Sequence, residues 1–191
     1  ADIRARGLIE CDMEDAQRIE GVAAAVLADS DARKLLDHCE REVTFTWTEL
    51  VRVDDQDVPI PCRARLDLLA VRRTATLIAD LKTTDDPSPA AFAKSCVSLG
   101  YHYQPPFYAR PLRQLLGHEP QFRFIAVRSR PPHEVVVWNV KRADIEAFDK
   151  QVTASLKRYA ECVLADTWTS PWESHGVQDL SFPRWALETR Q

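Results

Sequence analysis

The sequence predicts an α+β fold with a central mixed or mostly antiparallel β-sheet flanked by helices. Strand-like runs with alternating apolar residues occur in two groups, and segments with helical spacing of apolar residues lie before, between and after them. The chain of 191 residues is 45% hydrophobic and 28% charged, which suits one compact domain over residues 1–191. Because residue 1 is not Met, we expect this domain to be a piece that lacks an upstream segment.

The N-terminal third predicts two helices and a strand. Residues 12–27 carry apolar side chains on one helical face, with Asp12 as the N-cap, and residues 31–39 form a second, shorter helix. Residues 43–53 alternate and are rich in β-branched and aromatic types, which favours a strand. The polar residues 54–57 then predict a turn.

The middle of the chain predicts a hairpin followed by a helix. The strand-like runs 63–71 and 74–82 are separated only by Arg72 and Arg73, so we expect a tight turn between them. Ser88 is expected to cap a helix over residues 89–99.

The last third predicts a helix, two strands and a long helix. The first helix spans residues 104–116 and ends at Gly117, and Pro111 is expected to kink it. Residues 122–127 and 134–140 predict an antiparallel pair, and residues 144–164 form an amphipathic helix. The tail, 167–191, holds three tryptophans and is expected to pack as an irregular segment.

Composition excludes several classes of protein. No apolar run is long enough for a membrane span, and the N-terminal residues lack a secretory pattern. Five scattered cysteines give no zinc motif and fit a reduced, cytoplasmic protein. The net charge of −4 does not suit a simple DNA-coating protein. It leaves room for a nuclease, because an acidic site that binds cations adds negative charge.

One group of charged residues predicts a site that binds a metal ion. Asp80 and Lys82 are two residues apart on a predicted strand, so their side chains share a face. The hairpin brings Asp67 back beside Asp80. Two neighbouring carboxylates repel unless a cation lies between them, and Mg²⁺ prefers one or two carboxylates with water and phosphate oxygens. Arg63 and Arg65 share the strand face of Asp67 and are candidates for phosphate contacts, as are Arg72, Arg73, Lys94 and Arg110.

These residues also form a family pattern. The runs Arg63-Ala64-Arg65-Leu66-Asp67, Asp80-Leu81-Lys82-Thr83-Thr84 and Gln104-x-x-x-Tyr108 occur in the order and spacing of the PD-(D/E)XK nucleases. The sequence most resembles the RecE or exonuclease VIII type, whose C-terminal segment is also similar to residues 180–186. Two departures are that Leu66 replaces the usual Pro, and that no upstream G-x-x-x-H segment precedes residue 12.

The resemblance implies a restriction-endonuclease-like core and a set of roles. Asp67, Asp80 and the backbone carbonyl of Leu81 would bind the metal, and Lys82 would be the catalytic lysine. Glu42 is a further candidate ligand, with Glu40 as the alternative. Gln104 and Tyr108 would contact DNA, although Pro105 disfavours helical geometry at Gln104.

The function expected from this resemblance is a Mg²⁺-dependent exodeoxyribonuclease, with Mn²⁺ able to substitute. It would hydrolyse double-stranded DNA 5′→3′ in a recombination or phage pathway. The family also implies a ring-like trimer or tetramer and a single-strand annealing protein as partner. Two alternatives remain open: a catalytically impaired nucleic-acid-binding or interaction module of the same fold, and an endonuclease.

Overall fold

The computed structural model describes residues 11–170, 176–177 and 179–181. Its centre is a five-stranded sheet in the order β1-β2-β3-β4-β5, in which only β3 and β4 are parallel neighbours. The expected α+β architecture with a mixed sheet is therefore confirmed. The strands are β1 (Glu40–Val53), β2 (Gln56–Arg72), β3 (Ala75–Thr84), β4 (Gln121–Arg128) and β5 (Val135–Asn139).

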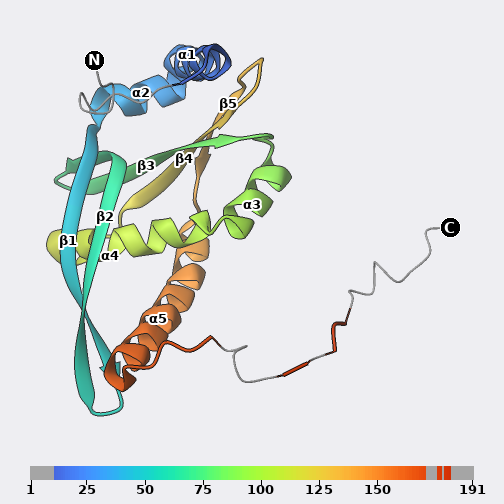
Figure 1. Ribbon diagram of the computed structural model, residues 1–191. Helices are drawn as coiled ribbons and strands as arrows, with labels where there is room; N and C mark the ends of the chain where they lie inside the picture. The colour runs from blue at the N-terminus through green and yellow to red at the C-terminus, as the bar shows by residue number, and fades with distance from the viewer. Residues whose placement is uncertain (1–10, 171–175, 178, 182–191) are drawn as a thin grey trace, which may run out of the picture.

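Helices cover both faces of this sheet (Figure 1). One face carries α1 and α2, and the other carries α3, α4 and α5, with the short 3₁₀ helix η2 between α3 and α4. The helices are α1 (Met13–Ala28), α2 (Ser30–His38), α3 (Pro89–Ser98), η2 (Tyr101–Tyr103), α4 (Gln104–Leu116) and α5 (Arg142–Ala165). Within the residues that the structure describes, none of these helices has the length and apolar character needed to cross a bilayer.

The two faces of β3 belong to different cores. Ile78 packs into the larger core with residues of α3, α4 and α5, whereas Ala79 packs into the smaller core beneath α1 and α2. Because side chains alternate along a strand, Asp80 lies on the face of Ile78. The two cores thus fix the direction of the side chains at the end of β3.

The hairpin of β1 and β2 is longer than the sequence suggested. β2 begins at Gln56, not at residue 63, and its ladder with β1 continues past Pro59 and Pro61. Among the described residues, this half of β2 pairs with β1 alone, so two alternate prolines can turn their missing N–H groups toward the unpaired edge. Figure 1 shows the hairpin extending beyond the other strands toward the C-terminal end of α5, where Ala160 packs against it.

Three local expectations have different outcomes. Ser88 is the N-cap of α3, but its side chain makes no capping hydrogen bond. α4 has its expected bounds and contains Pro111, and the kink expected at Pro111 stays a prediction. The described residues of the C-terminal tail are exposed, although the ring of Trp168 contacts that of Tyr159 on α5 edge to face, and most of the segment 180–186 lies outside the described residues.

Candidate active site

The end of β3 presents an acid and an amine on one face of the sheet. Asp80 is 3% exposed and forms an ion pair with Lys82, whose side chain is also mostly buried. Both side chains lie on the side of the larger core, as the alternation predicts. Leu81 points to the other face and is 41% exposed.

Asp67 lies where β2 separates from β3. The last paired residues of the two strands are Leu68 and Ala79, so Asp67 comes one step beyond the ladder, at the level of Asp80. Its Oδ2 atom accepts a hydrogen bond of 2.9 Å from the backbone N–H of Leu81. The structure therefore brings Asp67 next to the Asp80–Lys82 pair, with its carboxylate fastened to the backbone between them.

Burial of Asp80 is the largest influence on its protonation. Desolvation raises the pKa of Asp80 from 3.8 to about 6, while the ammonium of Lys82 opposes that rise. The negative charge of Asp67 raises the pKa of Asp80 further. Within the described residues, no hydrogen bond of ordinary geometry reaches the buried Oδ2 atom of Asp80, which contacts the Lys82 ammonium. A second cation at this point would relieve the repulsion between the two carboxylates.

The donors at this point fit Mg²⁺. Asp67, Asp80 and the carbonyl of Leu81 would supply oxygen ligands, and Mg²⁺ usually completes its octahedral shell with waters and substrate oxygens. The described part of the chain holds no group of three or more His, Cys, Asp or Glu side chains that could bind a metal. A cation would therefore rely on two carboxylates, which Mg²⁺ tolerates.

Glu42, the third candidate carboxylate, forms an ion pair with Arg65 and does not join the other two. Glu42 lies opposite Asp67 between the paired residues Arg41 and Val43, but it has a φ of +58° and forms an ion pair with Arg65. Glu40 continues the ladder with β2. In this structure neither glutamate joins Asp67 and Asp80 in a three-carboxylate group.

Tyr101 is a contact that the sequence did not reveal. The Lys82 ammonium lies over the Tyr101 ring, 4.6 Å from the ring centroid, so a cation–π interaction holds the amine in addition to its ion pair with Asp80. The only signal in the sequence was the aromatic run immediately before Gln104. The position of Lys82 is thus set by two partners, Asp80 and Tyr101.

The predicted DNA-contacting pair lies on α4. Gln104 adopts right-handed helical geometry despite Pro105, since η2 leads directly into α4, and its Nε2 atom donates to the Tyr108 hydroxyl at 3.3 Å. Burial raises the pKa of Tyr108, and the charges of Asp80 and Asp67 raise it further. Tyr108 therefore remains a neutral hydrogen-bond donor within electrostatic reach of both carboxylates.

Comparison with known proteins decides the family. The model of a PDDEXK-like domain of unknown function (DUF3799) matches residues 6–175. The chain belongs to this PDDEXK-like family. The search of curated proteins found no sequence that matches this chain.

One solved structure shows the same fold. A crystal structure from Eubacterium rectale, described as a "putative exonuclease", aligns with a TM-score of 0.63 and 14% identity over 90% of this chain. The alignment covers 64% of that protein, so the PDDEXK-like domain spans less than two thirds of its length. A second structure, SSO0001, aligns at a TM-score of 0.37 and 12% identity over 78% of this chain and 66% of that one, too low to show a common fold.

Arg63 and Arg110, two candidates for phosphate contacts, have different surroundings in the PDDEXK-like domain. Arg63 is exposed and lines a groove of about 620 Å³ together with Gln104 and Tyr108. Arg110, by contrast, is largely buried and pairs with Glu49 and with Asp149. Arg110 therefore holds α4 against its neighbours, and its expected phosphate contact is replaced by a structural role.

His102 is also structural. It is buried, its Nδ1 atom lies 3.0 Å from the carbonyl oxygen of Cys96, and its ring packs against Tyr103 and Phe148. These contacts orient η2, which carries Tyr101 at its first position. His102 thereby helps to position Tyr101, which contacts Lys82.

Proposed function

We propose that this PDDEXK-like domain is a Mg²⁺-dependent deoxyribonuclease that hydrolyses phosphodiester bonds. The observation that carries the proposal is the meeting of Asp67 with the Asp80–Lys82 pair at the point where β2 leaves β3. Two carboxylates, one partly buried amine and neighbouring polar side chains from α4 suit the anionic substrate and the charge that develops during its hydrolysis.

Each residue has a distinct task in this proposal. Asp67, Asp80 and the Leu81 carbonyl hold the cation, which supplies positive charge at the scissile phosphate when bound. Lys82, fixed between Asp80 and Tyr101, orients the attacking water and offsets negative charge on the phosphate. The remaining side chains position the DNA strand: Arg63 and Arg65 along β2, and Gln104 and Tyr108 along α4.

The finer assignment rests on the resemblance to the RecE type. We propose 5′→3′ digestion of double-stranded DNA, Mn²⁺ as a substitute for Mg²⁺, a ring-like trimer or tetramer, and a single-strand annealing protein as partner. The groove lined by Arg63, Gln104 and Tyr108 supports a path for DNA near the site, since the charges of Asp80 and Asp67 reach Tyr108. Sedimentation velocity would test the oligomer, and a monomer at every concentration would refute it.

The test is digestion of linear duplex DNA labelled at either the 5′ or the 3′ end, in Mg²⁺, in Mn²⁺ and in EDTA. The parent protein should release the 5′ label first, and only with a divalent cation. Asp80→Asn and Lys82→Ala should each lower the rate at least about a hundredfold. Arg33→Gln is the control, because Arg33 forms an exposed ion pair with Asp37 on α2.

The other outcomes separate the alternatives. Parental digestion by either Asp80→Asn or Lys82→Ala would refute the proposed site. Cleavage of closed circular DNA would identify an endonuclease. Binding of duplex DNA without cleavage in any cation would identify the catalytically impaired nucleic-acid-binding module.

A further inference from the structure

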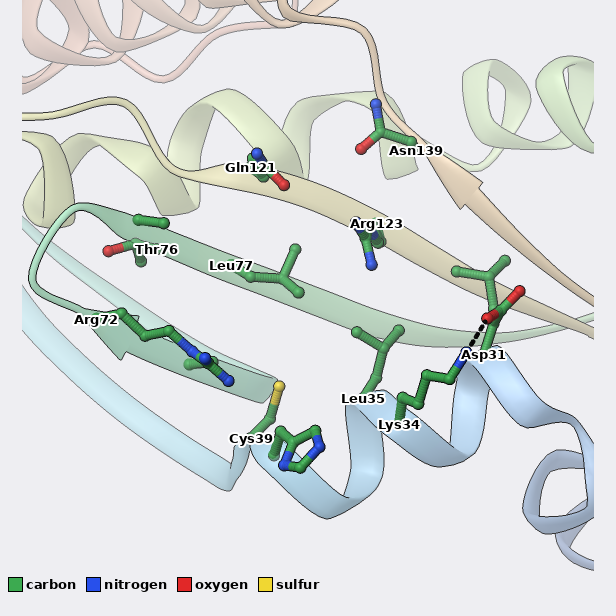
Figure 2. Close-up of a pocket in the computed structure, with 14 residues that line it drawn as sticks. Asp31, Lys34, Leu35, Cys39, Arg72, Thr76, Leu77, Gln121, Arg123 and Asn139 are labelled. Carbon is green, nitrogen blue, oxygen red and sulfur yellow. Dashed lines mark hydrogen bonds and ion pairs between the residues drawn. The ribbon is translucent and has the colours of Figure 1, made fainter.

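A second cavity lies on the opposite face of the sheet from Asp80. It encloses about 570 Å³ between α2, the turn that joins β2 to β3, and the strands β4 and β5 (Figure 2). Its residues from β3 are at the start of that strand, whereas Asp80 and Lys82 are near its end. Residues of the cavity, such as Leu35 and Leu77, belong to the smaller core, so the sheet separates it from the proposed nuclease site.

The charges around this cavity are unbalanced. Among the described residues that line it, the single carboxylate is that of Asp31, which already pairs with Lys34 at 3.0 Å. Arg72 and Arg123 also line it, and within the described residues neither guanidinium has an ion pair or a side-chain hydrogen bond. Two unpaired guanidinium groups in one cavity favour an anion, because Arg presents several N–H donors in a planar fork.

Both arginines lie near the same thiol. Burial raises the pKa of the Cys39 thiol, and the positive charges of both Arg72 and Arg123 oppose that rise. Both guanidinium groups therefore lie within electrostatic reach of one sulfur atom. In Figure 2, Arg72 extends from the end of β2 toward Cys39.

The rest of the lining suits an apolar group with polar edges. Leu35, Leu77 and Val137 supply apolar surface, and the amide side chains of Gln121 and Asn139 lie at the wall formed by β4 and β5. Ligand sites commonly combine such a surface with a few polar groups, in volumes of roughly 300–1,000 Å³. The cavity therefore matches a ligand that joins an anion to a flat apolar ring.

We propose that this cavity binds a mononucleotide, with its phosphate monoester at Arg72 and Arg123 and its base against the apolar side chains of Leu35, Leu77 and Val137. The amides of Gln121 and Asn139 would meet the polar edge of the base. This inference does not depend on the proposed nuclease activity, since it uses none of the same residues.

Isothermal titration calorimetry with deoxyadenosine monophosphate tests the proposal. The titration is made in EDTA on the Asp80→Asn protein, so that neither cation binding nor cleavage contributes. Saturable binding is expected, and Arg72→Gln and Arg123→Gln should each weaken it at least about tenfold, the cost of a lost charge-assisted contact. Arg72→Lys should weaken it less, because the charge remains while the planar fork is lost.

A matched control, two further titrations and a duplex-DNA binding measurement complete the experiment. Arg52→Gln removes an exposed arginine that pairs with Asp57 away from the cavity, and it should bind the nucleotide like the parent. Inorganic phosphate and deoxyadenosine should each bind more weakly than the nucleotide. Equal affinity for phosphate alone, or no saturable binding at all, would overturn the proposal. So would arginine variants that lose affinity for duplex DNA while no nucleotide binds.

Discussion

The Oδ2 atom of Asp67 accepts a hydrogen bond of 2.9 Å from the backbone N–H of Leu81, the residue between Asp80 and Lys82. At this level β2 has left its ladder with β3, so a side-chain oxygen takes the place of a backbone acceptor. The same carboxylate is a proposed cation ligand. Asp67 therefore joins the framework of the sheet to the chemistry of the site.

Substitution of Asp67 should separate these two roles. Asp67→Asn keeps an oxygen that can accept from Leu81 but removes the charge, so Mn²⁺ affinity should fall at least about tenfold while the free energy of unfolding stays within about 1 kcal/mol of the parent. Asp67→Ala should lose both and unfold more easily by about 1 kcal/mol. Titration calorimetry and urea unfolding measure the two quantities. Undiminished Mn²⁺ affinity in Asp67→Asn would exclude this carboxylate as a ligand.

Tyr101 should act as a positioning residue for Lys82. Tyr101→Leu removes the ring beneath the ammonium, whereas Tyr101→Phe keeps it. We expect the leucine variant to lower kcat about tenfold with little change in KM, and the phenylalanine variant to remain close to the parent. Steady-state DNA digestion measures both constants. If phenylalanine is as damaging as leucine, the hydroxyl matters and the cation–π account is wrong.

The pKa of Asp80 predicts an unusual pH dependence of stability in EDTA. A carboxyl whose pKa rises from 3.8 to about 6 on folding stabilises the protein most below pH 4, and this contribution is lost as pH rises through 6. Between about pH 4 and pH 7 the parent should lose on the order of 2 kcal/mol relative to Asp80→Asn. Urea unfolding at several pH values measures this difference.

Asp86 provides the control of opposite sign. A hydrogen bond from the Ser88 backbone N–H lowers the pKa of Asp86, so its contribution is present at neutral pH and lost as pH falls. The parent should therefore gain stability relative to Asp86→Asn as pH rises. A slope of the same sign for both variants would show that burial does not govern Asp80.

Arg110 should matter for stability and not for DNA affinity. Arg110→Met leaves Glu49 and Asp149 without their partly buried partner, which should cost about 3 kcal/mol. The exposed pair of Arg33 should contribute less than about 1 kcal/mol, so Arg33→Gln is the comparison. Chemical unfolding and fluorescence anisotropy with duplex DNA measure the two effects. If the Arg110→Met protein has parental stability but binds DNA weakly, the structural role is wrong and Arg110 contacts a DNA phosphate.

The sequence predicted the fold class and most of the elements because their signals are local. Alternation alone places Asp80 and Lys82 on one face of β3, and the short turn after Arg72 implies the hairpin that returns Asp67 to them. The match of residues 6–175 to a PDDEXK-like family agrees with the resemblance that those residues carried. Local patterns were sufficient where neighbours in sequence are also neighbours in the sheet.

Contacts between distant segments could not be predicted in this way. Arg110 and Glu49 form an ion pair although they are 61 positions apart in the sequence. Tyr101 contacts Lys82 because η2, which carries Tyr101, packs beside the end of β3. The early start of β2 was missed because two prolines normally argue against a strand, and only the arrangement of neighbouring strands shows which edge of β2 is unpaired. Each of these depends on tertiary packing.

The prolines of β2 also limit how copies of this protein can associate. A long strand with an unpaired edge can recruit a strand from another molecule, since its backbone donors and acceptors are available. Pro59 and Pro61 remove two successive donors from that edge, so a foreign strand laid along it would leave carbonyl groups unmatched. Assembly by continuation of the sheet is thereby discouraged along this half of β2.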